Sequence, residues 1–220
     1  MLTQKRFLFR FKIPCGYIGR GDELSELYRL PDLSMLELSS GELSGSGFGG
    51  VLPDFRAGWN EQGLMFSVTV SGKKQSLWCK STSPTESDGI QIYIDTRDVK
   101  DVHRATRFCH RLIFLPTVSD GSRPNPCAFW LPIHRAKAHP NPIDAKKINL
   151  KNEIFNGGYK LNIFIPQEVL TGFDPIEYSS LGFHFVVVDR ELGNRYFIVS
   201  PPFPYDNDPS LWGTLLLVRR

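Results

Sequence analysis

Short runs in which apolar residues occupy every second position recur along the chain and indicate β-strands. In the clearest run, residues 89–95, these positions hold Ile90, Ile92 and Ile94. Such a period places the isoleucines on one face of a strand, because successive side chains point to opposite faces. The run at 181–189 is almost wholly apolar, which predicts a strand buried on both faces. Further strands are predicted at 7–13, within 57–71 as a hairpin, and at 107–115, 128–133, 159–165, 195–200 and 212–218.

Turn residues separate these runs at the short intervals that are typical of a β-sandwich, as at 60–63. The predicted fold class is therefore all-β, an antiparallel β-sandwich of about nine or more strands. A single domain over residues 1–220 is expected, in which residues 1–50 form an N-terminal strand and a loop rich in glycine and serine. One or two short helices are expected, at 22–30 and 167–170.

Charge and hydropathy argue against two classes of partner. The 220-residue chain has a net charge of +3, and no run of lysine or arginine is longer than a pair. A nucleic-acid interface needs clustered basic residues, so no nucleic-acid partner is predicted. No apolar stretch reaches the roughly 20 residues of a membrane helix, and residues 1–10 lack the apolar segment of a signal peptide. A cytoplasmic protein with no membrane partner is therefore expected.

The cysteines Cys15, Cys79, Cys109 and Cys127 form no CxxC pair. In a reducing compartment they are expected to be buried free thiols. A zinc site built from the last three of them and His110 is the alternative, although their spacing matches no zinc-ribbon or zinc-finger pattern.

Four blocks of sequence, in order, resemble the family 9 carbohydrate-binding modules and the related DOMON-like sandwiches. Residues 58–70 (GWNEQGLMFSVTV) are similar to the family's W-D hairpin, and residues 86–95 (ESDGIQIYID) to its D-S-V-E-I-F-I-D strand. Residues 158–166 (GYKLNIFIP) match G-Y-x-x-E-x-x-I-P. The fourth block joins 181–189 (LGFHFVVVD) to a closing segment at 208–217 (DPSLWGTLLL). The resemblance implies a β-sandwich over most of the chain and a binding role without catalysis.

The resemblance also implies where a sugar would bind, and there this sequence departs from the family. The family holds a sugar between two exposed tryptophans, one about three residues before the aspartate of the second block and the other shortly before the last D-P-S. Here Thr85 takes the first place, and residues 205–207 occupy the second. We therefore predict an altered sugar clamp whose aromatic platform is Trp78, Tyr93 and Tyr205.

A concave face of the sandwich is a second candidate for a ligand site. His184 shares a strand face with Val186 and Val188, opposite Phe183 and Phe185. A lone histidine in such a strand is either a satisfied core residue or a member of a binding face. In the second case we expect it to lie with residues that point away from the aliphatic side of their strands: Gln91, Tyr93, Asn162 and Phe164.

The segment around His110 leaves two registers open. If Phe108 and Leu112 point into the core, His110 does so too; in the other register Arg107 and Arg111 do. Either way a buried polar side chain needs a partner, because leaving it unpaired would cost roughly 1–3 kcal/mol. A structural ion pair, a satisfied core histidine, an anion pocket and an acid–base pair are the alternatives. The available carboxylates are Asp88, Asp95 and Asp189.

Two acidic segments are candidates for calcium, the one cofactor that the sequence suggests. Asp95 and Asp98 lie in the first segment, and Asp206 and Asp208 lie in the second. Neither segment has the alternating aspartates of an EF-hand loop. A calcium site in a sandwich loop and an exposed turn are therefore the alternatives for both.

No nucleophile elbow, HExxH or phosphate-binding loop is present in the sequence, and no enzyme activity is predicted. The leading hypothesis is a carbohydrate-binding-like module for a saccharide or another small polar ligand. The alternatives are an intracellular interaction or scaffold protein that reuses the fold and, third, a hydrolase that uses His110 or His184 with an aspartate. The candidate ligand-binding residues are Trp78, Gln91, Tyr93, His110, Phe164, His184 and Tyr205.

Overall fold

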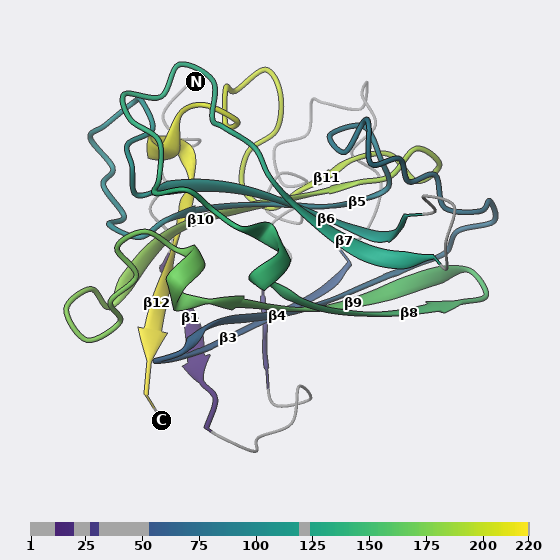
Figure 1. The fold of residues 1–220 in the computed structure, drawn as a ribbon, viewed down its shortest axis with the longest axis horizontal. Helices are drawn as coiled ribbons and strands as arrows, with labels where there is room; N and C mark the ends of the chain where they lie inside the picture. Colours follow the sequence, from purple (N-terminus) through teal and green to yellow (C-terminus); the bar gives the residue numbers. More distant parts are fainter. Residues whose placement is uncertain (1–11, 20–26, 31–52, 119–123, 220) are drawn as a thin grey trace, which may run out of the picture.

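The computed structural model describes residues 12–19, 27–30, 53–118 and 124–219, which form an all-β structure (Figure 1). Its helical segments are short 3-10 turns: η3 (Ala145–Lys147), η4 (Gln167–Val169) and η5 (Pro209–Leu211). In this described part of the chain, no helix is long and apolar enough to span a membrane. The strands are β1 (Lys12–Tyr17), β2 (Tyr28–Arg29), β3 (Asp54–Asn60), β4 (Gly63–Ser71), β5 (Gly89–Asp95), β6 (Cys109–Val118), β7 (Asn125–Trp130), β8 (Asn149–Phe155), β9 (Gly158–Pro166), β10 (Ser180–Val188), β11 (Arg195–Tyr196) and β12 (Gly213–Val218).

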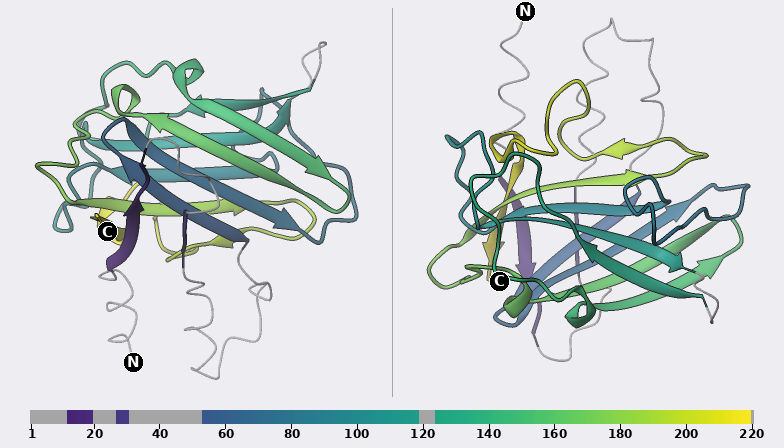
Figure 2. Two further views of the ribbon diagram at one scale, coloured as in Figure 1. Left: turned by 90° about the horizontal axis from the view of Figure 1, so that it is seen from below. Right: turned by 45° about the horizontal axis from the view of Figure 1, so that its top comes forward.

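The strands form one continuous sheet that folds over into two layers (Figures 1 and 2). The first layer has the order β7-β6-β5-β10-β12, and the second has the order β3-β4-β9-β8. Strand β1 joins the layers, because it pairs with β12 on one side and with β3 on the other, in parallel with both. The remaining pairs are antiparallel. The sandwich is therefore confirmed, and its sheet is mixed where a purely antiparallel one was predicted.

Aromatic rings from both layers meet in the core. Phe55 of β3 stacks on Phe185 of β10 with ring centroids 3.9 Å apart. Phe66 of β4 stacks on Phe183 of β10 at 5.5 Å. The three isoleucines of β5 point into the same core, as their alternation predicts. Both faces of β5 and β10 are buried, because loops cover the outer face of the first layer.

Several predicted elements differ from those observed. The first strand runs over Lys12–Tyr17, and residues 7–11 of the predicted strand lie outside the described residues. The helix expected at 22–30 is wrong for residues 28 and 29, which form strand β2 and pair with β3. Residues 20–26 and the glycine-rich loop at 39–50 are not among the described residues. The helix expected after Pro166 is the single 3-10 turn η4. Strand β8 was not predicted, because most of its side chains are exposed and its apolar residues do not alternate.

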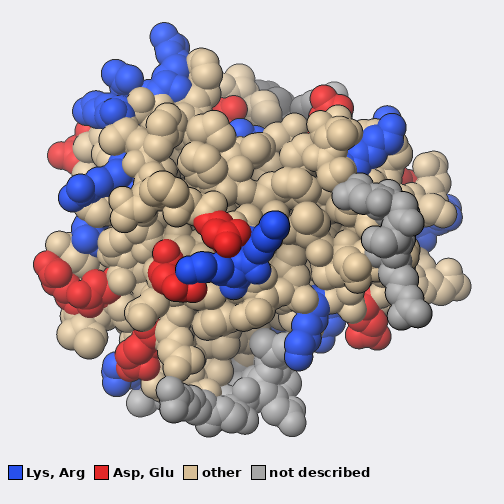
Figure 3. All heavy atoms as spheres, in the orientation of Figure 1, with Lys and Arg blue, Asp and Glu red and all other residues tan. Residues whose placement is uncertain are grey.

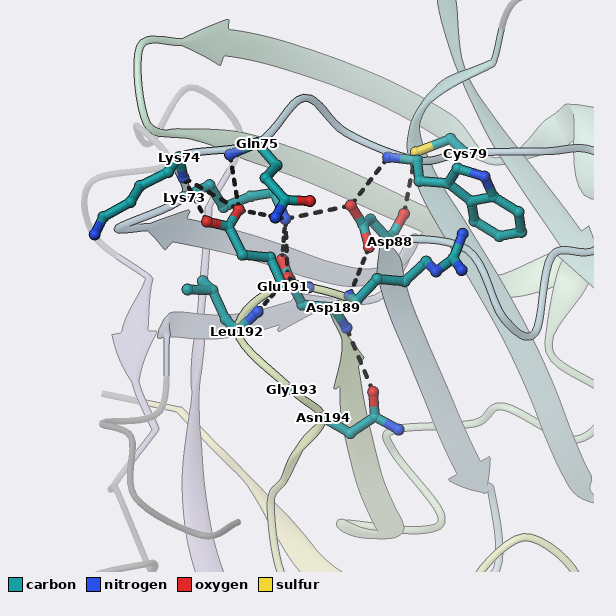
Figure 4. A network of polar contacts seen from close by, with 12 residues as sticks. Lys73, Lys74, Gln75, Cys79, Asp88, Asp189, Glu191, Leu192, Gly193 and Asn194 are labelled. Atoms are coloured by element: carbon teal, nitrogen blue, oxygen red, sulfur yellow. Dashed lines mark hydrogen bonds and ion pairs between the residues drawn. The ribbon is translucent and has the colours of Figure 1, made fainter.

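A buried ion network connects the two layers (Figure 4). Lys73 follows β4 of the second layer, whereas Asp88 precedes β5 and Asp189 follows β10 of the first. The Lys73 Nζ donates to both carboxylate oxygens of Asp189, at 2.8 and 2.7 Å, and lies 3.3 Å from Asp88 Oδ2. The side chains of the three residues are at most 3% exposed.

Backbone groups complete this network. Asp88 accepts the N–H groups of Trp78 and Arg190, and Asp189 accepts those of Glu191 and Leu192. Burial alone would lower the pKa of Lys73, but the carboxylates of Asp189 and Asp88 outweigh it, so the pKa is raised. The ammonium group therefore stays charged and holds the end of β4 against the start of β5 and the end of β10.

We expect Lys73→Met to lower the free energy of unfolding by about 3–5 kcal/mol, because two buried carboxylates would lose their cation. Lys74→Met is the matched control. The Lys74 side chain is exposed, and its backbone N–H, which the substitution keeps, donates to Glu191. Its replacement should change the unfolding free energy by less than roughly 0.5 kcal/mol. Urea unfolding of the three proteins measures both effects, and equal stability of the two variants would contradict this role for Lys73.

Candidate functional site

A cluster of aromatic and polar side chains lies on the outer face of the first layer. Gln91 and Tyr93 point to this face, because the isoleucines of β5 point into the core. Strand pairing places Arg111 of β6 and His184 of β10 on either side of Tyr93. We call this set the tyrosine cluster; its members are Gln91, Tyr93, Arg111, His184, Tyr196, Tyr205 and Trp212.

Two half-buried tyrosines form the outer part of the tyrosine cluster. The Tyr205 ring packs against His184, with centroids 5.0 Å apart, and edge-on against Tyr93 at 5.9 Å. Tyr196 packs edge-on against Tyr205 at 5.5 Å. The Trp212 indole N–H donates to the carbonyl of Tyr205 at 2.7 Å, which fixes the loop that carries this ring. The cluster thus has a buried interior and an accessible aromatic edge.

Gln91 holds the only charged member of the tyrosine cluster in place. Its Oε1 accepts from the Tyr93 hydroxyl at 3.1 Å and from Arg111 Nη2 at 3.0 Å, and its Nε2 donates to the carbonyl of Thr85. The Arg111 guanidinium lies 5.6 Å from the Tyr93 ring centroid, and its Nε is buried without a hydrogen-bond partner. No carboxylate of the described residues forms a salt bridge with Arg111. Its charge is therefore not neutralised by a carboxylate of the described residues.

The interior of the tyrosine cluster is uncharged at neutral pH. Burial lowers the pKa of His184 to about 3. Burial also raises the pKa of Tyr93 to about 12, although the charge of Arg111 opposes this shift. Burial raises the pKa of Tyr205 as well. A neutral imidazole beside protonated phenols, with no carboxylate among the cluster's members, provides hydrogen bonding and stacking and lacks the charged acid–base pair that hydrolysis uses.

The structure brings together four of the candidate ligand-binding residues: Gln91, Tyr93, His184 and Tyr205. It does not bring Asn162 and Phe164 to them. Both lie on β9 of the second layer, whose alternate residues, such as Ile163, point into the shared core. Their side chains therefore point to the opposite outer face of the sandwich, and the predicted grouping of these two with the others is wrong.

His110 lies on the core side of β6, where one ring nitrogen has a hydrogen-bond partner and the buried Nδ1 has none. It is opposite Ile94 of β5, and its Nε2 accepts the N–H of Thr171 at 2.9 Å. Burial lowers the pKa of His110 to about 4, so the ring is neutral. Of the three carboxylates that the sequence offered as partners, Asp88 and Asp189 bind Lys73, and Asp95 accepts backbone N–H groups of its own loop. Of the two registers, the observed one therefore places His110 inside and Arg111 outside.

Trp78 belongs to the surroundings of the buried ion network. Its ring lies 4.1 Å from the Arg190 guanidinium and 5.1 Å from Lys80 Nζ, and its backbone pairs with Asp88. The ring is half-buried between these cations. Its role in an aromatic platform stays a prediction.

Three of the acidic candidates for calcium, Asp95, Asp98 and Asp208, interact with other groups of the protein. Asp95 accepts the N–H groups of Arg97 and Val99, and Asp98 accepts from the Thr214 hydroxyl and pairs with Lys100. No group of three or more His, Cys, Asp or Glu in residues 12–19, 27–30, 53–118 and 124–219 could hold a metal ion, and the four cysteines are free. Calcium stays a prediction. In the second segment, Asp208 accepts the N–H of Ser210 and contacts His103, and Asp206 is exposed.

Sequence reasoning did not select three members of the tyrosine cluster. Arg111 was considered only as one of two registers, and Tyr196 and Trp212 were assigned to strands without a role. The alternation of β5 could have identified Arg111, because an outward Tyr93 requires an outward neighbour on β6. Nothing in the sequence around Tyr196 or Trp212 indicates that the two side chains converge.

We expect acid to destabilise the protein through His184. Its pKa is about 3 in the folded chain and 6.5 in the unfolded chain, so below pH 6.5 the unfolded state binds a proton that the folded state does not. Relative to His184→Leu, the wild type should lose up to about 2 kcal/mol more between pH 8 and pH 5. Urea unfolding at both pH values gives this double difference, which cancels any packing change. Parallel pH dependences of the two proteins would show that His184 is not buried and neutral.

Two solved structures of a family 9 carbohydrate-binding module from Caldicellulosiruptor kristjanssonii, one in complex with cellotriose and one in complex with glucose, are similar to this chain. Each has a TM-score of 0.54 and 14% sequence identity, over 96% of this chain. The match covers 95% of the cellotriose-bound chain and 97% of the glucose-bound chain. No family model and no curated protein matches the sequence. The likeness to DOMON-like sandwiches stays a prediction, whereas the resemblance to family 9 is confirmed at the level of the fold: the chain has the β-sandwich of these carbohydrate-binding modules.

Proposed function

We propose that this protein is a non-catalytic module that binds a saccharide at the tyrosine cluster. The observation that carries the proposal is that Tyr93 contacts both Arg111, a half-buried guanidinium without a carboxylate partner in the described chain, and the half-buried ring of Tyr205. Sugar recognition needs both elements: an aromatic surface for the C–H face of the ring and directional donors for its hydroxyl groups. The fold shared with modules seen in complex with cellotriose and glucose supports the same function.

The site is organised before any ligand arrives. Gln91 accepts a hydrogen bond from Arg111, and the indole of Trp212 donates one to the backbone carbonyl of Tyr205. Neither the guanidinium nor the ring then needs to give up much conformational freedom on binding, which favours affinity. A neutral interior suits an uncharged sugar ring, whose hydroxyl groups both donate and accept.

Of the two places that the resemblance assigns to the family's clamp, the first borders the tyrosine cluster and the second lies in it. The carbonyl of Thr85 accepts from Gln91, and the ring of Tyr205 packs on Tyr93. With threonine at the first place and tyrosine at the second, a ligand would stack on one side only. We therefore propose an open aromatic platform in place of a two-sided clamp, and weaker binding than a clamp would give.

A serine, a histidine and an aspartate meet near the tyrosine cluster, yet their geometry favours binding over hydrolysis. Ser210 Oγ and Asp208 Oδ2 both approach the same nitrogen of His103, Nδ1, at 3.0 and 3.1 Å. The Ser210 hydroxyl also donates to Asp208 at 2.6 Å. A catalytic triad uses the two ring nitrogens separately, one for the serine and one for the aspartate. This arrangement therefore differs from a triad, which supports binding over hydrolysis.

We expect Tyr205→Ala and Arg111→Gln each to weaken saccharide binding roughly tenfold or more, equivalent to about 1.4 kcal/mol. The first variant removes stacking area, and the second removes the charged donor. Isothermal titration calorimetry with glucose and cellotriose measures the affinities. Phe164→Ala is the control, because Phe164 lies on the opposite outer face of the sandwich and its removal should leave the affinity unchanged.

Thermal unfolding of each variant shows whether it is folded before binding is compared. Binding that survives both Tyr205→Ala and Arg111→Gln but is lost in Phe164→Ala would move the site to the second layer. Absence of binding by the wild type to a broad panel of neutral and acidic saccharides would reject the proposed function altogether.

A further inference from the structure

A cavity of about 350 Å³ beside the tyrosine cluster is lined by His103, Arg104, Arg135 and Asn207. Three of these side chains are basic, one is an amide, and no carboxylate lines the cavity. In Figure 3 lysine and arginine side chains gather at the upper left, where residues 96–108 and 131–145 lie in Figure 1. The cavity is thus lined with hydrogen-bond donors and carries positive charge.

The two loops that carry the arginines of this cavity are anchored in the tyrosine cluster. Ala105 and Ala136 pack against the cluster, so the adjacent Arg104 and Arg135 stand outside it and line the cavity. Arg104 Nε donates to the carbonyl of Arg135 at 2.8 Å, and the N–H of Lys137 donates to the carbonyl of Ala105 at 2.7 Å. These two bonds join the loops to each other, and the first also positions the Arg104 side chain.

The charge of both arginines is uncompensated within the described residues. Neither Arg104 nor Arg135 forms a salt bridge there, and the neighbouring carboxylate of Asp208 contacts His103 and Ser210 instead. Arg135 has a left-handed backbone, with φ of 59°. A residue other than glycine adopts this conformation at an energetic cost, and such residues concentrate at functional sites.

We propose that this cavity binds the anionic group of an acidic saccharide, a carboxylate or a sulfate, while the sugar ring lies at the tyrosine cluster. Guanidinium groups bind such oxyanions through paired, charge-assisted hydrogen bonds. The two parts belong to one site because Asn207 lies two residues after Tyr205, and because the alanines next to both arginines contact the cluster. The assignment of the ligand as a saccharide rests on the proposed function, whereas the anion site rests on the cavity alone.

Matched ligands test this proposal on the whole protein by isothermal titration calorimetry. The probes are cellobiose, cellobiouronic acid, cellobiose sulfate and inorganic sulfate. We expect the wild type to bind each acidic disaccharide roughly tenfold or more tightly than cellobiose, because each supplies a charge-assisted pair. The double variant R104Q/R135Q should lose this preference and keep its affinity for cellobiose. Lys137→Gln is the control, because Lys137 is exposed on the same loop and does not line the cavity.

The outcomes separate the failure of this inference from that of the proposed function. Equal affinities for neutral and acidic disaccharides, unchanged in R104Q/R135Q, would overturn the anion site and leave saccharide binding standing. Binding of sulfate that requires both arginines, with no saccharide bound, would support the anion site and overturn the proposed function. A preference for only one acidic disaccharide would support the anion site and identify the anionic group that it binds. A preference lost equally in Lys137→Gln would overturn the anion site, because general surface charge would then explain the preference.

Discussion

The buried contact between Lys73 and Asp189 fixes the relation between the two layers on which the candidate site depends. Lys73 follows β4 of the second layer, whereas Asp88 and Asp189 adjoin the paired residues Gly89 and Val188 of the first. A shift of β5 by one residue would turn its isoleucines outward and Tyr93 inward. It would also remove Asp88 from the ammonium group and leave a buried charge unpaired. The ion network therefore opposes the one error in register that would destroy the tyrosine cluster.

Burial of β5 and β10 on both faces explains where the functional side chains lie. An antiparallel sheet of this kind often leaves one face to solvent, but here loops seal the outer face and contribute Ala105, Ala136, Tyr205 and Trp212 to it. The same loops carry Arg104 and Arg135 at their exposed positions. In each of the two loops a residue that packs is thus adjacent to one available for binding, and the packing of the first positions the backbone of the second.

The sequence predicts the strands better than their arrangement in space. The alternation in 89–95 and the apolar run at 181–189 identify β5 and β10 and the faces that they bury. Alternation tells which residues of a strand share a face, but it does not tell which layer the strand joins, so Phe164 was grouped with residues on the far side of the core. The parallel pairing of β1 depends on a contact between the two ends of the chain, which no local pattern contains. The cavity-lining arginines lie in irregular loops, where no period exists to predict their direction.

The distribution of charge links the tyrosine cluster to the cavity beside it. Because burial moves the pKa of His184 down to about 3 and that of Tyr93 up to about 12, neither group changes its charge between these limits. The positive charge of the site is carried at its rim, by Arg111 and by the two arginines of the cavity, and arginine does not lose its proton in proteins. A ligand would therefore meet a neutral aromatic surface bordered by permanent cations. Such a surface favours an acidic sugar whose negative group lies close enough to contact one of these arginines. This selectivity needs no titrating group in the cluster's interior.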